Sequence, residues 1–91
     1  MPQITRTVRI GSSRGLHARP AKLLATAAKS AGIPITIGKV GENAVNAASL
    51  LSVMAIGAKF GEDVEISVAD GDGADLVLAS LVEIVATNHD E

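Results

Sequence analysis

Alternating apolar and polar residues mark three stretches of the chain, and each predicts a β-strand with one apolar face. The stretches span residues 3–10, 33–37 and 62–68, with isoleucine or valine at alternate positions. Arg6 interrupts the apolar face of the first stretch. A fourth, short return strand is expected within residues 40–45, which contain a Gly-Glu-Asn turn signal.

Three further stretches repeat apolar residues at three- and four-residue spacing, which predicts helices. They cover about residues 17–30, 50–56 and 74–86. Pro20 must lie in the first turn of the first helix, where its missing N–H costs nothing. Gly32 suits a left-handed cap at the end of that helix. The predicted order of elements is therefore β-α-β-β-α-β-α.

The one-sided apolar character of the strands predicts a sheet that helices cover on one face only. An antiparallel sheet with helices on its apolar side is a two-layer α+β sandwich, which is the expected fold class. Ninety-one residues suffice for one domain, so residues 1–91 are expected to form a single unit with a thin aliphatic core. The periodicity does not give the order of the strands.

The amino-acid composition excludes or disfavours several kinds of functional site. The chain has no cysteine, which excludes disulfides, thiolate metal sites and thiol catalysis. Two histidines without cysteine disfavour a zinc site, and no metal or cofactor is expected. No apolar run approaches the ~18 residues of a membrane span, and the first residues lack the apolar core of a signal peptide. A soluble, cytoplasmic protein without membrane insertion is therefore expected.

Charge is divided between the two parts of the chain, although the net charge is only −2. Residues 1–39 carry seven basic groups and no acid, whereas residues 40–91 carry all ten acids and a single lysine. The division indicates either an anionic ligand or partner for the first part, or charges that mix in space after folding. A nucleic-acid partner is disfavoured because the chain has no Trp or Tyr for stacking on bases.

The segment between the first strand and the first helix holds the best candidate site. Pro20 fixes the helix start near Ala18, so His17 lies just before or at the first backbone N–H groups without an intrahelical acceptor. These groups carry the positive end of the helix dipole and bind oxyanions readily. Arg19 can present its planar fork to phosphate oxygens. Gly15 lets the loop adopt a conformation that other residues avoid.

His17 has two interpretations. A positive helix end and nearby arginines disfavour the protonated imidazole, so the ring is expected to be neutral near pH 7 and able to act as a nucleophile. The same N–H groups and Arg19 would then neutralise a phosphoryl group carried by the ring. The alternative is that His17 is only a cap or a surface residue, which is common at a helix start.

The segment Gly-Leu-His-Ala-Arg-Pro-Ala at residues 15–21 resembles the active-site signature of the HPr family. These proteins are the histidine-containing phosphocarriers of the bacterial phosphoenolpyruvate-dependent sugar phosphotransferase system. Residues 45–54 resemble a second family segment, and the resemblance covers essentially the whole chain. It implies an open-faced β-sandwich, in which three helices lie on one side of a four-stranded antiparallel sheet.

The same resemblance implies a function. His17 would accept a phosphoryl group at Nδ1 from phosphorylated enzyme I and pass it to the IIA domains of sugar transporters, with Arg19 as the partner of the group. Such a protein is a covalent carrier and not an enzyme with turnover of its own.

Ser49 aligns with a serine that a dedicated HPr kinase phosphorylates in many Gram-positive members of the family. A phosphate there would be stabilised by the helix dipole. Ala48 departs from the basic residue that many regulated members carry, and Ser49 or Asn46 can also serve simply as a helix cap. The alternative function is a regulatory binding module of the same fold, acting through Ser49 or within a nitrogen-type paralogous phosphorelay.

The short second helix carries Leu50, Leu51 and Met54, which the resemblance implies to be part of the docking surface for enzyme I and IIA domains. Some of the three are expected to face the core and at least one to be exposed. Lys22 and Arg19 would rim this apolar patch for fast, weak docking. Nothing in the sequence indicates an obligate oligomer, so a monomer is expected.

Weaker candidates lie near the two ends of the chain. Ser12 and Ser13 are interpreted as turn residues, or as helix caps or phosphate contacts. His89 lies in a polar tail and is expected to be solvated. The Gly-Asp-Gly at residues 71–73 lacks the spaced ligands and the terminal Glu of a calcium loop.

Overall fold

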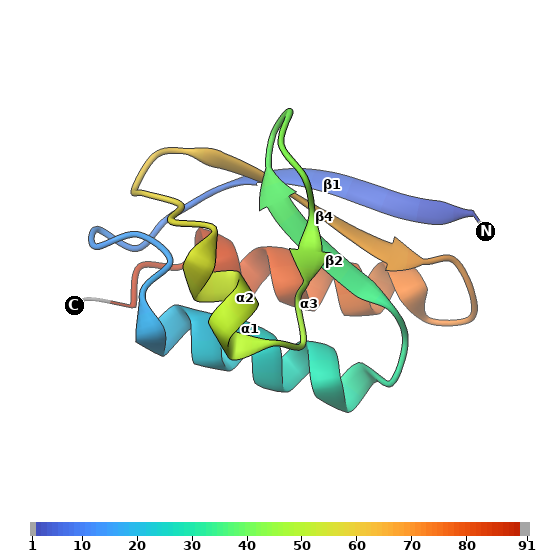
Figure 1. Ribbon diagram of the computed structural model, residues 1–91. Helices are drawn as coiled ribbons and strands as arrows, with labels where there is room; N and C mark the ends of the chain where they lie inside the picture. Colours follow the sequence, from blue (N-terminus) through green and yellow to red (C-terminus); the bar gives the residue numbers. More distant parts are fainter. Residues whose placement is uncertain (1, 90–91) are drawn as a thin grey trace.

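The computed structural model describes residues 2–89, in which strands and helices follow one another in the predicted order (Figure 1). Their bounds are β1 (Gln3–Arg9), α1 (Ala18–Ala31), β2 (Ile35–Lys39), β3 (Val45–Asn46), α2 (Leu50–Ala55), β4 (Asp63–Ala69) and α3 (Ala74–Ala86).

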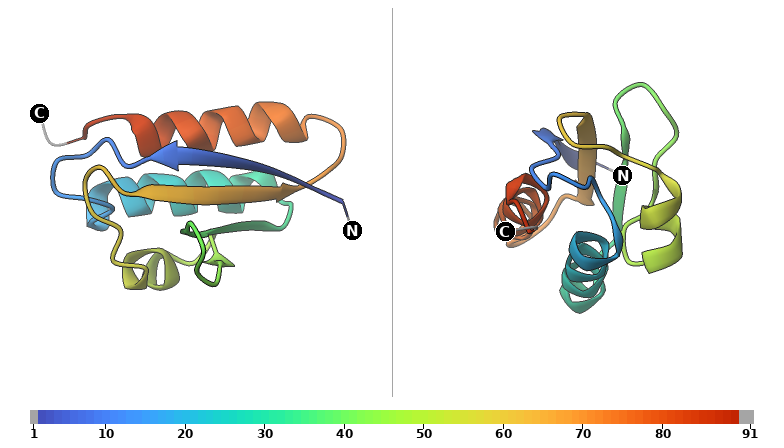
Figure 2. Two further views of the ribbon diagram at one scale, coloured as in Figure 1. Left: turned by 90° about the horizontal axis from the view of Figure 1, so that it is seen from above. Right: turned by 90° about the vertical axis from the view of Figure 1, so that its left-hand side faces the viewer.

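The four strands form one antiparallel sheet in the order β1-β4-β2-β3. The central strand β4 pairs with β1 along its whole length, from Ala69 opposite Gln3 to Asp63 opposite Arg9, and with β2 on its other side. The three helices lie on one face of the sheet, and the other face is open (Figure 2). The predicted open-faced α+β sandwich is confirmed, and the pairing supplies the strand order that periodicity did not give.

The core lies between the sheet and the helices and is aliphatic. Val64, Ile66 and Val68 of β4 are fully buried, as their alternation predicts, and Leu24 of α1 is buried to the same degree. The only aromatic residue, Phe60, has an exposed fraction of 62% and takes no part in the core. The thin aliphatic core expected from composition is therefore confirmed.

The structure corrects the bounds of the second and third strands. β2 begins at Ile35 and not at Ile33, because Pro34 has no N–H to donate to a neighbouring strand. The return strand expected within residues 40–45 shrinks to the two residues of β3. The reason is that residues 40–44 form the exposed loop of the hairpin.

A turn before β4 is closed by the carboxylate of Glu62. Its Oε1 accepts a hydrogen bond from Lys59 N at 2.7 Å and lies 3.5 Å from Lys39 Nζ. The hydrogen bond from the Lys59 N–H is the main cause that lowers the pKa of Glu62 from its ordinary value of 4.5, and the charge of Lys39 adds to it.

Glu62→Gln should therefore lower stability at neutral pH and leave it unchanged in acid. A carboxylate whose pKa is lowered in the folded state stabilises the fold above its unfolded pKa, and this contribution is lost as pH falls through the folded value. Because solvent screens a partly exposed carboxylate, the loss is small. Thermal unfolding near neutral pH and below about pH 3 measures it. The variant Glu42→Gln, at an exposed position of the hairpin loop, is the control. The prediction would be contradicted if Glu62→Gln lowered the Tm as much in acid as at neutral pH, or if it lowered the Tm no more than Glu42→Gln does.

Candidate functional site

The loop between β1 and α1 is held by backbone hydrogen bonds. Gly15 N donates to Ser12 O at 2.9 Å, which closes a turn, and Leu16 N donates to Ala58 O at 2.9 Å. Leu16 has an exposed fraction of 5% and anchors the loop in the core. Gly15 has a φ of +76°, which is the unusual loop conformation predicted for this glycine. The loop therefore delivers His17 to the start of α1 in a defined position.

His17 is the N-cap residue of α1. It is extended, with φ −80° and ψ −171°, and its carbonyl accepts the first helical hydrogen bond from Ala21 N at 3.0 Å. Pro20 is buried in the first turn, as predicted. Helix geometry leaves the first N–H groups without an intrahelical acceptor, so Ala18 and Arg19 supply the donors at this end. The half-buried His17 thus stands at the positive end of the helix dipole.

Basic side chains lie around this helix start. Arg19 and Lys22 are exposed on α1, and Arg14 is exposed in the preceding loop. An anion at the helix start would therefore meet N–H donors and a guanidinium together. A groove between α1 and α3 is lined by Arg19, Lys22, Leu23, Thr26, Ala27 and Ile84.

Ser49 is the N-cap residue of α2. Its Oγ accepts a hydrogen bond from Ser52 N at 3.3 Å, and its carbonyl accepts one from Val53 N at 3.0 Å. Asn46, the other candidate cap, lies in β3, and its side-chain oxygen accepts from Ala48 N at 3.0 Å instead. The capping interpretation of Ser49 is confirmed, and a regulatory phosphate on its hydroxyl stays a prediction.

Ser49→Ala should lower the free energy of unfolding by about 1 kcal/mol, because Ser52 N loses its acceptor at the start of α2. Ser49→Asp keeps an acceptor and should stay near the stability of the wild type. Urea denaturation of the two variants measures the difference, with Ser30→Ala at an exposed position of α1 as the control. Equal stabilities of Ser49→Ala and Ser30→Ala would contradict the capping role.

Leu50, Leu51 and Met54 all lie at the surface, with exposed fractions of 37%, 80% and 40%. The expected division of the three between core and surface is therefore wrong. The physical reason is that α2 has six residues and buries one of them, and Val53 takes that position. We call the three exposed residues the α2 patch. A groove between α1 and α2, lined in part by Lys22 and Leu50, leads from this patch to the cations of α1.

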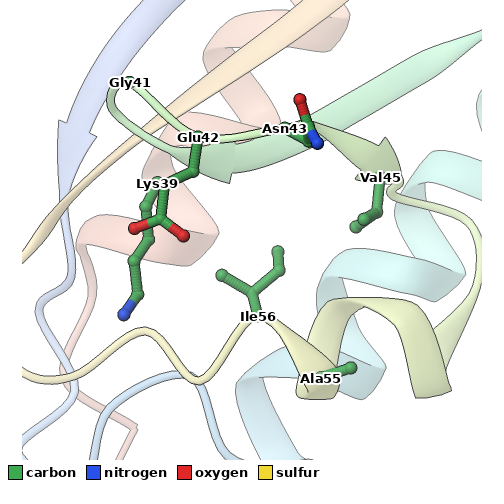
Figure 3. Close-up of a pocket in the computed structure, with 7 residues that line it drawn as sticks. All are labelled: Lys39, Gly41, Glu42, Asn43, Val45, Ala55 and Ile56. Carbon is green, nitrogen blue, oxygen red and sulfur yellow. The ribbon is translucent and has the colours of Figure 1, made fainter.

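A separate hollow lies between the β2–β3 loop and the end of α2, where the side chains of Val45 and Ile56 point toward one another (Figure 3). Lys39 and Glu42 are the charged residues of its lining. Within residues 2–89, no group of three or more His, Cys, Asp or Glu is placed to hold a metal ion. Over the same residues, no helix has the length and apolarity that crossing a membrane requires.

The C-terminal segment reaches the loop before α1, which sequence patterns did not predict. Ser12, interpreted as a turn residue, has an exposed fraction of 1% and bonds to Thr87 and His89. His89, expected to be solvated, is half-buried, and its Nε2 lies 2.7 Å from Ile84 O, so that expectation is wrong. Residues 90–91 of the tail lie outside the described part. Contacts between residues 75 apart in sequence leave no local signature that could have predicted them.

The segment around His17 lies within the part of the chain that is similar to known proteins. The family model described as "PTS HPr component phosphorylation site" matches residues 4–87. The chain is 42% identical over 86 residues to phosphocarrier protein HPr of Streptomyces coelicolor, which covers 94% of this chain and 91% of that protein. It is 37% identical over 83 residues to phosphocarrier protein HPr of Haloferax volcanii, covering 90% and 92%. The crystal structure of a phosphocarrier protein HPr from Bacillus anthracis superposes with a TM-score of 0.82 at 29% identity, covering 93% of this chain and 99% of that one.

Proposed function

Because the chain belongs to the HPr family of phosphocarrier proteins of the phosphotransferase system, we propose that His17 accepts a phosphoryl group from phosphorylated enzyme I and passes it to IIA components of sugar transporters. The observation that carries the proposal is the position of His17 at the N-cap of α1, inside the region that the family model matches. In this role the protein is a covalent carrier and not an enzyme.

The proposed acceptor atom is Nδ1 of the His17 imidazole. Its lone pair attacks the phosphorus of the phosphorylated enzyme I, so that an N–P bond to His17 forms while the bond to enzyme I breaks. The leaving group on enzyme I departs with the electron pair of the broken bond, and no water or external proton is consumed. Transfer to a IIA component repeats the exchange, with the His17 ring as the leaving group.

The start of α1 supports this exchange because it stabilises the phosphoryl group only moderately. The N–H groups of Ala18 and Arg19 and the Arg19 guanidinium offset its negative charge. Arg19 is exposed, and a charge at an exposed helix end gains only about 0.3–1 kcal/mol from the dipole. A weak hold suits a carrier, since the same group must leave for the next partner.

The proposed docking surface for enzyme I and IIA components is the α2 patch together with Lys22. The patch is apolar and exposed, and the groove lined by Lys22 connects it to the helix that begins after His17. One surface that serves two partners in turn needs weak, fast contacts, which a small apolar patch beside cations provides. The flexible side chain of Met54 suits contact with two different partner surfaces.

The test is to incubate the protein with phosphoenolpyruvate and enzyme I of the same organism and to follow the intact mass. One phosphoryl group should appear per chain and should be lost in brief acid, because a phosphohistidine is acid-labile and a phosphoserine is not. An unchanged mass, with enzyme I itself phosphorylated in the same sample, would contradict the proposal.

Arg19→Ala should slow phosphoryl transfer roughly 10- to 100-fold while the fold stays intact, because a guanidinium that meets developing negative charge is lost. Lys29→Ala is the control, since it removes one positive charge from the same helix about 15 Å further along its axis. Single-turnover transfer from enzyme I measures both rates. Equal rates for the two variants would show that Arg19 has no part in the transfer.

A further inference from the structure

Backbone carbonyls at the C-terminal end of α3 accept hydrogen bonds from residues that follow the helix. The last carbonyls of a helix lack intrahelical partners. Thr87 donates to Glu83 O with both its N and its Oγ1, at 3.1 and 2.6 Å. The Nε2 of His89 lies 2.7 Å from Ile84 O. The segment after α3 is therefore folded back on the helix end.

The loop before α1 joins the same helix end. Gly11 N donates to Val85 O at 3.0 Å. A Cβ on Gly11 would lie 1.9 Å from Ala86 O, so the backbone of the loop is pressed against the last residues of α3. Figure 2 shows the loop after β1 and the segment after α3 side by side at one end of the molecule. The exposed Asn88 Oδ1 accepts a long hydrogen bond from Ser13 N at 3.5 Å, and one further side chain bridges the two segments where they are buried.

That side chain is Ser12, and its hydroxyl uses both of its hydrogen-bonding capacities. Oγ donates to Thr87 O at 3.2 Å and accepts from His89 N at 3.2 Å. The backbone carbonyl of Ser12 accepts from Gly15 N at 2.9 Å, so the same residue also closes the turn that leads to His17. With an exposed fraction of 1%, the Ser12 side chain has essentially no water to replace these partners.

We propose that Ser12 is a positioning residue for phosphoryl transfer, because its hydroxyl fastens the loop that carries His17 to the segment Thr87–His89. The inference rests on the proposed function of His17. Since transfer requires the ring nitrogen at a defined distance from the phosphorus of a docked partner, a loop that moves by a fraction of an ångström slows the reaction. The proposed docking surface lies on α1 and α2, and none of its residues takes part in the hydrogen bonds of the Ser12 hydroxyl.

Ser12→Ala tests the proposal, and Ser80→Ala at an exposed position of α3 is the matched control. Ser12→Ala should lower kcat for transfer from enzyme I roughly 3- to 10-fold at unchanged KM for the carrier, because docking is intact and the docked ring is misplaced. A chain ending at Asn88 loses the bond from His89 N but keeps the one to Thr87 O, so it should show part of this loss, and adding Ser12→Ala to it should cost only the remainder.

Hydrogen exchange supplies a readout that does not depend on transfer. In Ser12→Ala, the amides of Gly15 and His89 should exchange several-fold faster than in the wild type, while the amide of Leu24 inside α1 stays protected. An unchanged kcat would overturn the positioning role, as would faster exchange of Leu24 together with the loop, which would trace the loss to the whole fold. If the wild-type protein takes up no phosphoryl group, the proposed function is contradicted. In that case hydrogen exchange still tests the role of Ser12, and an unchanged exchange rate of the Gly15 amide in Ser12→Ala would show that Ser12 does not hold the loop.

Discussion

His17→Ala should abolish phosphoryl acceptance, so we expect the variant to keep its unmodified mass after incubation with phosphoenolpyruvate and enzyme I. The substitution removes the imidazole nitrogen that is the proposed nucleophile, and alanine offers no atom that could form an N–P bond. The fold should survive, because the first helical bond of α1 uses the backbone carbonyl of residue 17, which accepts from Ala21 N. Circular dichroism of the variant should match that of the wild type.

The control for this experiment is the second histidine. The chain has two histidines, so His89→Ala keeps the proposed acceptor and should still reach one phosphoryl group per chain. Its rate is expected to fall, because the lost ring, whose Nε2 lies 2.7 Å from Ile84 O, helps to hold the segment against the loop, but the endpoint should not change. An acid-labile phosphate on His17→Ala, or its absence on His89→Ala after full incubation, would overturn the assignment of His17.

The fold class follows from local patterns because alternation and helical spacing act within single elements. The buried residues Val64, Ile66 and Val68 of β4 alternate without interruption, and this strand was predicted to within one residue at each end. The predicted bounds of a strand are wrong where the alternation of apolar residues extends beyond the residues that can pair with a neighbouring strand. Ile33 continues the alternation of Ile35 and Ile37 in sequence, yet the proline between them keeps it out of the ladder.

The candidate site likewise has features that local sequence determines and features that depend on the tertiary structure. The geometry of residues 15–21 is local, since a glycine, a histidine and a proline at fixed spacing determine a turn and a helix start. The exposure of Leu51 is decided by how a six-residue helix rests on the rest of the molecule, and no pattern in so short a segment gives that. Ser12 and His89 meet only because β1 and α3 end at the same edge of the fold. Such contacts need the tertiary structure.

Gly15→Ala should cost roughly 2–3 kcal/mol of stability, a large fraction of the total for a domain of this size. A residue with a Cβ at φ +76° costs about 1–2 kcal/mol, and here the Cβ would also lie 2.6 Å from Ala58 O and 3.1 Å from Lys59 Cα. Ala58 O cannot withdraw without losing the hydrogen bond from Leu16 N, which adds about 1 kcal/mol. Urea denaturation measures the loss.

Gly32→Ala separates the backbone strain from the close approach. Gly32 has a similar φ of +70°, and around its Cβ position no atom of the described residues lies within 4 Å, so this variant should lose only about 1–2 kcal/mol. It should also keep the transfer rate of the wild type, whereas Gly15→Ala should lower it, because the loop must move away from Ala58 and carries His17 with it. Equal losses of stability in the two variants would show that the contact between the loop and Ala58 yields freely, and the bond between them would then not be what positions the acceptor.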